Sequence, residues 1–126
     1  MKILANREKL VKAKSLHIKL PMYYIDVYCL TPSMNKELVE KHGWENCHDG
    51  QTRNYIGEHR QVMVRFNYDT PGTVAHEMLH VVQMVMSAIG HNYDETGDEP
   101  SAYLLGYLVE EYYRLKKEHQ KKNKKK

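Results

Sequence analysis

Two histidines and a glutamate stand at the spacing that a hydrolytic metal site requires. The sequence of residues 76–80 is HEMLH, so His76 and His80 lie four positions apart, with Glu77 directly after the first of them. On an α-helix, this spacing brings both imidazoles onto one face, one turn above the other. Two neutral imidazoles can bind Zn²⁺, and a carboxylate beside them can take a proton from a zinc-bound water. The pattern therefore indicates a zinc site suited to hydrolysis.

The residues before the motif predict a strand and then the start of a helix. Between residues 61 and 66, apolar side chains occupy every second position, which is typical of a half-buried strand. A polar, proline- and glycine-containing segment follows. Asp69 or Thr70 is expected to cap the helix, with Pro71 in its first turn, where the missing N–H is harmless.

The helix that carries the motif is expected to run from Thr73 to Ile89 and to end at Gly90. Apolar residues occupy most of its circumference, and a helix of this kind is buried, so we expect it to be the central helix of the domain. Burying two histidines and a glutamate without partners is unfavourable. The three groups should therefore bind a metal, face a cleft, or form a hydrogen-bonded polar cluster in the core.

A zinc site of this type needs a third protein ligand, with the fourth position left for water. A second helix is predicted from about Asp98 to Lys117, and its small residues Ala102 and Gly106 would allow close packing against the first helix. Glu99 lies on the same stripe and is the preferred third ligand. In the competing interpretation, Glu99 completes a capping box with Thr96. The other candidate ligands in this segment are His91, Asp94, Glu95 and Asp98.

These features resemble the gluzincin branch of the zinc metallopeptidases. HEMLH, a glycine that ends the helix, and Glu99 followed by Ala102 on a second helix carry the resemblance, which covers roughly residues 61–107. The small chain is also similar to minimal gluzincin-like domains and to small phage and prophage proteins with HExxH. In the best-known gluzincins an asparagine precedes the ligand glutamate, whereas this chain has Asp98.

The resemblance implies a zinc-dependent peptidase that acts on peptide or protein substrates. His76, His80 and Glu99 would bind Zn²⁺, and Glu77 would be the catalytic base that passes a proton from the zinc-bound water to the leaving amine. It also implies that the strand before the motif lies at the edge of the cleft and pairs with extended substrate. Candidate donors to the oxyanion that forms are His91, Tyr93 and Tyr103.

Two other functions fit the same residues. A zincin-like module could bind zinc for a structural or assembly role, for example in a phage particle, without peptidase activity. A metal-free binding domain could instead keep the motif as a polar cluster in its core. Glu77 argues against a structural zinc site, because such a site fills all four positions with protein ligands and needs no base.

The rest of the chain predicts an α+β fold of the minimal zincin type. We expect a small, mostly antiparallel sheet packed on a buried HExxH helix, which a second long helix follows. The further elements are a short helix near residues 6–14, a strand at 23–30, a helix at 34–42 closed by Gly43, and a hairpin of 52–56 with 60–66.

Length and composition fit one cytoplasmic domain at residues 1–117 with a lysine-rich, solvated tail at 118–126. Residues 114–126 hold eight of the nineteen lysines and arginines against one acidic residue, so the tail accounts for the net charge of +3. No motif for specific nucleic-acid binding accompanies these charges. We expect no signal peptide and no membrane-spanning segment, which favours the cytoplasm. The resemblance to small phage and prophage proteins implies a bacterial or phage-infected host cell. Cys29 and Cys47 are expected to be ordinary reduced residues.

Overall fold

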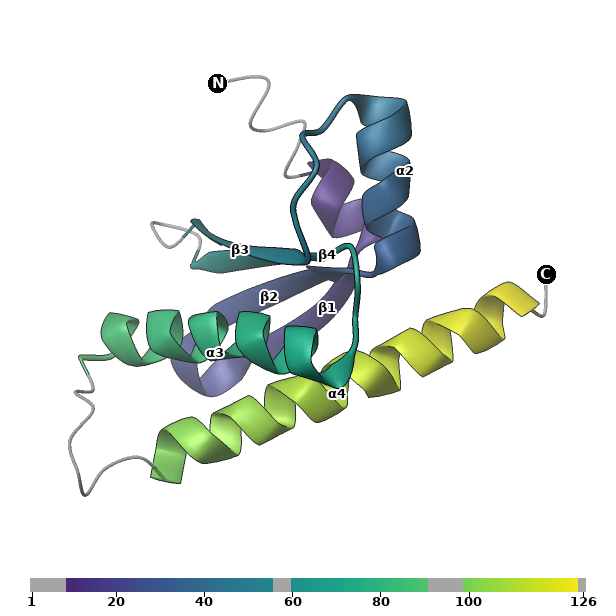
Figure 1. The fold of residues 1–126 in the computed structure, drawn as a ribbon. Helices are drawn as coiled ribbons and strands as arrows, with labels where there is room; N and C mark the ends of the chain where they lie inside the picture. The colour runs from purple at the N-terminus through teal and green to yellow at the C-terminus, as the bar shows by residue number, and fades with distance from the viewer. Residues whose placement is uncertain (1–8, 56–59, 91–98, 125–126) are drawn as a thin grey trace.

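A computed structural model of the protein describes residues 9–55, 60–90 and 99–124 (Figure 1). The side chains of residues 54, 55, 99 and 124 are not described. In this part of the chain, β1 (Leu16–Leu20), β2 (Ile25–Leu30), β3 (Gly50–Tyr55) and β4 (Gln61–Phe66) form one sheet in the order β1-β2-β4-β3. The pairs β1/β2 and β3/β4 are antiparallel, and β2/β4 is parallel. The α+β class, the mostly antiparallel sheet and the β3/β4 hairpin are confirmed.

Strand β4 lies inside the sheet and is buried on both faces, from Gln61 to Phe66. The expectations that this strand is half-buried and lies at the edge of the cleft are therefore wrong. On one face, Arg65 donates a hydrogen bond to Asn35 in helix α2. On the other face, the Phe66 ring packs edge-on against Tyr112, with 4.7 Å between the ring centroids. The polar residues of the alternating pattern are covered by protein rather than by water, and β3 forms the edge instead.

Two elements of the first half differ from expectation. Strand β1 was not predicted, although Leu16, Ile18 and Leu20 alternate inward in it. Strand β2 begins at Ile25 rather than at residue 23, because residues 21–23 form a 3₁₀ turn that ends at Tyr24 in the left-handed conformation, with φ 54°.

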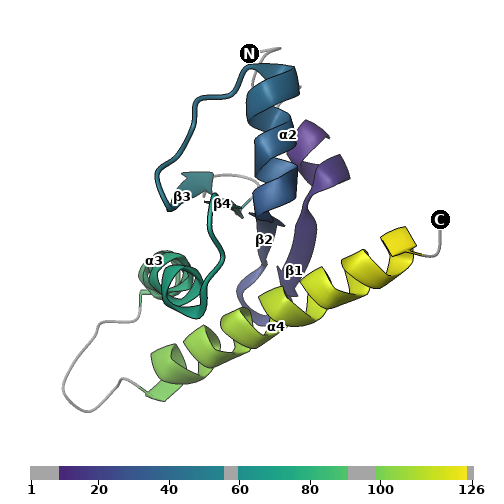
Figure 2. The same ribbon diagram turned by 45° about the vertical axis from the view of Figure 1, so that its right-hand side comes forward.

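Helix α2 (Pro32–His42) lies on the face of the sheet opposite to helices α3 and α4 (Figure 2). Thr31 caps it by accepting a bond from the Met34 backbone N–H, and Gly43, with φ 68°, ends it as predicted. A short helix at residues 9–14 lies on the same side as α2.

Helix α3 (Pro71–Ala88) begins after Thr70, whose hydroxyl accepts from the Thr73 N–H, and Gly90 follows it with φ 74°. The predicted bounds are confirmed within two residues, with Thr70 rather than Asp69 as the cap. The expectation that the helix is buried all round is wrong. Val74, Met78, Val81 and their neighbours on the same stripe are buried, whereas the opposite side reaches solvent. The helix lies on one face of the sheet, so among the described residues its apolar partners gather on one side.

Helix α4 (Glu99–Lys124) crosses the same face and extends beyond the sheet, seven residues past its predicted end at Lys117 (Figure 1). Its buried stripe consists of Ser101, Leu104, Leu108 and Tyr112. Ala102 and Gly106 are exposed, so the predicted packing through small residues is wrong. The larger side chains bury more apolar area, and this decides which face turns inward.

Asp69 fixes α4 against the start of α3. Its carboxylate accepts a bond from the Tyr112 hydroxyl at 3.0 Å and pairs with Lys116, and its backbone carbonyl accepts from the Tyr113 hydroxyl at 2.8 Å. Burial, and then the charge of Asp69, raise the pKa of Tyr112, so the phenol stays protonated and donates. This contact sets the position of α4 along the turn that precedes the HEMLH residues. None of the helices in the described ranges is both long and apolar enough to cross a membrane.

Gly106→Ala tests which face of α4 is exposed. A Cβ at this position would meet no atom within 4 Å. Alanine is therefore expected to raise the free energy of unfolding by about 0.5–1 kcal/mol, because it reduces the freedom of the unfolded chain in a helix interior. Leu108→Ala, on the buried stripe, should lower it by about 2–5 kcal/mol. Urea denaturation measures both, and a destabilising Gly106→Ala would contradict the packing of α4.

Candidate metal centre

His76, Glu77 and His80 come together in the middle of α3. One ligand atom from each lies within 4.8 Å of the others, and no other group of three potential ligands occurs in the residues that the structure describes. The two imidazole rings are 5.0 Å apart between centroids and nearly perpendicular, at 82°. The helical spacing therefore produces the clustering that the sequence predicts.

The two histidines and the glutamate differ in exposure. The side chain of His76 is 68% exposed and that of Glu77 only 7%. His80 is exposed as well. The histidines thus open to solvent, and the argument that burial must force them into a metal site or a core cluster does not apply to them. It applies to Glu77, which needs a polar partner.

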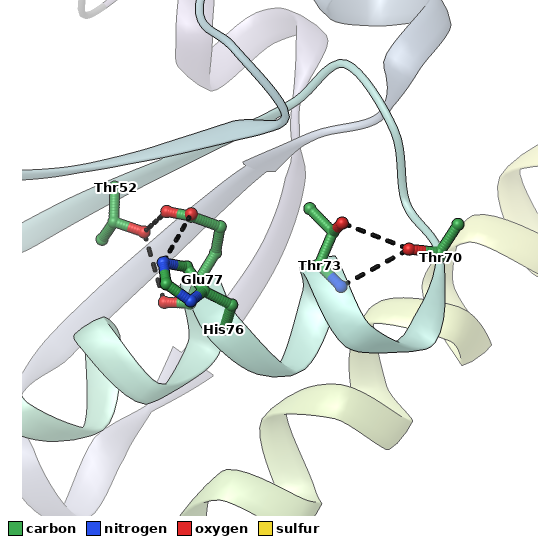
Figure 3. Close-up of polar contacts among 5 residues, drawn as sticks. All are labelled: Thr52, Thr70, Thr73, His76 and Glu77. Atoms are coloured by element: carbon green, nitrogen blue, oxygen red, sulfur yellow. Dashed lines mark hydrogen bonds and ion pairs between the residues drawn. The ribbon is translucent and has the colours of Figure 1, made fainter.

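The edge strand β3 supplies that partner (Figure 3). The Thr52 hydroxyl lies 2.8 Å from Glu77 Oε1 and 3.2 Å from the Glu77 backbone carbonyl. The second carboxylate oxygen, Oε2, lies 3.8 Å from His76 Nε2. Glu77 therefore lies between β3 and His76, with Oε1 directed to Thr52 and Oε2 directed to His76.

Gly50, at the start of β3, makes room for Glu77. A Cβ on Gly50 would lie 2.8 Å from Glu77 Cγ and 3.2 Å from the Arg65 carbonyl oxygen. The absent side chain lets the glutamate pass beneath the strand. Sequence reasoning missed Gly50 and Thr52, since each becomes significant only when the β3/β4 pairing places it over α3.

An open hollow of about 360 Å³ adjoins the cluster. Its lining includes Glu77 and His76 from the helix and His48, Asp49 and Gly50 from the segment that enters β3. This hollow gives a ligand access to Glu77 and His76 from the side on which α3 begins.

Arg65 holds the segment that forms one wall of the hollow. Its guanidinium donates to the backbone carbonyl of Glu45 at 2.7 Å and to the side chains of Asn35 and Gln51, and lies over the Trp44 ring. Just beyond the last β3/β4 pair, the backbone N–H of Asn67 donates to the carbonyl of Asp49 at 2.9 Å. These bonds attach residues 45–49 to Arg65 of β4 and to Asn67 after it. They therefore hold His48 and Asp49 in place beside the hollow.

The predicted third ligand is not placed. His91, Tyr93, Asp94, Glu95 and Asp98 lie outside the described residues, and Glu99 begins α4 with its side chain undescribed. The preference for Glu99 depends on the expectation that Ala102 and Gly106 pack against α3. Both are exposed, so this reason for choosing Glu99 as a ligand is lost. Of the predicted oxyanion donors, Tyr103 is 76% exposed on α4.

Neither cysteine joins the cluster. Cys29 and Cys47 are buried free thiols, as expected. Burial raises the pKa of the Cys29 thiol, which makes it a poor metal ligand and nucleophile. Cys47 lies next to His48, but its sulfur accepts a bond from the Asn35 amide at 3.7 Å.

Comparison with known proteins adds no family to this geometry. No protein-family model matches the chain, and neither a similar curated protein nor a similar solved structure was found. The chemistry of this cluster is therefore inferred from its own residues and contacts.

Gly50→Ala tests whether Glu77 is held beneath β3. The added methyl must displace the glutamate or the Arg65 backbone, and overpacking of this kind lowers the free energy of unfolding by about 1–3 kcal/mol. Gly72→Ala is the matched control, because a Cβ on Gly72, in the same hollow, would meet no atom within 4 Å. Thermal and urea denaturation measure the difference. Equal stability of the two variants would show that Glu77 does not occupy the space under Gly50.

Proposed function

We propose that this protein is a zinc-dependent peptidase in which His76 and His80 bind the metal and Glu77 is the general base. The observation that carries the proposal is the cluster itself, in which the ligand atoms of the three residues lie within 4.8 Å of one another on one helix. Glu99, or another donor near the start of α4, would complete the protein ligands. Zinc bound there would supply an activated water and polarise the carbonyl of the substrate.

The exposure of the histidines supports a catalytic rather than a closed site. With His76 and His80 on the solvent-facing side of α3, a metal held by them would keep a position open for water. A structural zinc site is normally enclosed by four protein ligands. The hollow beside the cluster supplies space for part of a substrate.

The contacts of Glu77 suit a general base. Thr52 occupies Oε1, whereas Oε2 is directed towards His76 and therefore towards the metal position. A carboxylate oxygen there can accept a proton from a bound water and donate it to a leaving amine. Because the glutamate is buried against β3, its orientation is set before a substrate arrives.

The edge position of β3 supports an extended peptide as the substrate. In the described sheet, β3 pairs with β4 on one side only. An extended peptide can add to such an edge through backbone hydrogen bonds, and its side chains can then enter adjacent hollows. Since Thr52 of this strand contacts Glu77, a peptide aligned there would pass beside the base.

A zinc module with a structural or assembly role is the second candidate function. The observation that favours it is that Glu77 belongs to the same group of three donors as the histidines. If Glu77 were a ligand, it could not serve as the base. The two functions thus assign opposite roles to the same carboxylate.

Glu77→Gln separates these roles. The amide cannot accept the proton, so we expect the variant to keep about one zinc per chain and to lose roughly 10²–10⁴-fold in kcat on a peptide library. His76→Ala and His80→Ala should lose the zinc itself, and His119→Ala, on α4, should behave as the wild type. Zinc is measured by elemental analysis. Loss of zinc from Glu77→Gln would support the structural role, and wild-type cleavage by this variant would refute the mechanism.

Glu99→Gln tests the third ligand. Removal of a direct ligand should weaken zinc binding by more than the roughly 10–100-fold that loss of an outer partner causes. Competition with a chromophoric chelator measures the affinity. Glu110→Gln, an exposed position further along α4, is the matched control. Unchanged affinity in Glu99→Gln would assign the third ligand to another residue.

A further inference from the structure

We propose that Thr52 is a positioning residue that keeps Glu77 in the orientation of a base and away from the metal as a ligand. This inference rests on the proposed function, because it assigns Thr52 a role in the reaction of that site. Thr52 would not touch the substrate or the metal. It would act through the carboxylate to which its hydroxyl is bonded.

The first step is the direction of the hydrogen bond. A threonine hydroxyl has one proton, and two Glu77 oxygens lie within reach, Oε1 at 2.8 Å and the backbone carbonyl at 3.2 Å. The carbonyl already accepts the bond of the helix, and bonds to a charged carboxylate are the stronger ones. The proton of Thr52 is therefore assigned to Oε1.

The second step is that Glu77 has few other restraints. Within the described residues, its side chain has polar contacts with Thr52 and with His76, and the latter is the longer one at 3.8 Å. The carboxylate is nearly buried, so a lost bond would leave Oε1 without a partner and drive the group to another position. A zinc ion held by His76 and His80 would lie next to Glu77, so the released carboxylate would be expected to bind it as a ligand.

The third step concerns the strand that carries the hydroxyl. Thr52 is in the middle of β3, opposite Val64 of β4, and is held there by the antiparallel register. Gly50, two residues earlier on the same side of the strand, leaves the space through which Glu77 reaches Thr52. The edge strand thus supplies the space and the hydrogen bond for Glu77, whereas the two histidine ligands come from α3. Metal binding and base orientation are separable by mutation.

The variants Thr52→Val and Thr52→Ser separate the hydroxyl from the shape of the side chain. Valine keeps the volume and the preference for a strand but removes the donor, whereas serine keeps the donor. In the zinc-loaded, full-length protein, Thr52→Val should lower kcat by about 10–100-fold, the usual effect of losing an outer-shell partner. KM should remain unchanged, and Thr52→Ser should recover most of kcat.

Thr31→Val is the matched control. It makes the same substitution at the cap of α2, on the other face of the sheet, where the hydroxyl accepts from the Met34 N–H. It should lower stability without lowering kcat. A Thr52→Val enzyme with wild-type kcat, or a Thr52→Ser enzyme as slow as Thr52→Val, would overturn the role of Thr52. If the wild-type zinc protein cleaves no peptide, the proposed function itself fails.

A measurement without catalysis tests the contact independently. The ¹³C signals of the glutamate carboxyl groups are recorded at fixed pH in the full-length protein without zinc, and Glu77→Gln identifies the signal of Glu77. Thr52→Val should shift that signal, while Thr52→Ser and Thr31→Val should leave it close to its wild-type position. An unshifted Glu77 signal in Thr52→Val would overturn the inference whatever the activity.

Discussion

The rotation of α3 on the sheet is the constraint on which the candidate site depends. Val74, Met78, Val81 and Val85 are completely buried and lie on one stripe of the helix. With that stripe against the sheet, the positions at 76 and 80 turn to solvent, and position 77 turns towards β3. Any other rotation would expose these apolar side chains, and each exposed side chain would cost roughly 1.5–3 kcal/mol. The packing of the core therefore fixes the opposite environments of the histidines and the glutamate.

The supports of the site come from both faces of the sheet. On one face, Asp69 ties the turn before α3 to Tyr112 of α4. On the other face, Arg65 holds the segment that leads into β3 through Asn35 and the carbonyl of Glu45. The first contact positions the helix that carries the HEMLH residues, and the second positions the edge strand. His76, Glu77 and His80 thus all depend on the packing of α3, and Glu77 depends in addition on its contact with Thr52 of β3.

The sequence predicted the local features well and the long-range ones poorly. The HEMLH cluster, the cap at Thr70 and the closing glycines follow from helical spacing and end chemistry, which short segments determine. The face of α4 and the burial of β4 depend on which partner covers them, so the sequence wrongly predicts an inward Gly106 and a half-buried strand at residues 61–66. Thr52 and Gly50 could not be found, because only the pairing of β3 with β4 places them over Glu77. The role of Glu99 remains a prediction.

X-ray absorption at the zinc edge of the zinc-loaded protein tests the central claim most directly. If His76 and His80 bind the metal and Glu77 does not, we expect two imidazole nitrogens and further oxygen ligands at about 2.0–2.2 Å, no sulfur, and the same spectrum for Glu77→Gln. A zinc–sulfur distance of about 2.3 Å would show that a cysteine binds the metal and would contradict the assigned ligands. A Glu77→Gln spectrum that lacks an oxygen ligand would show that this glutamate binds the metal and is not the base.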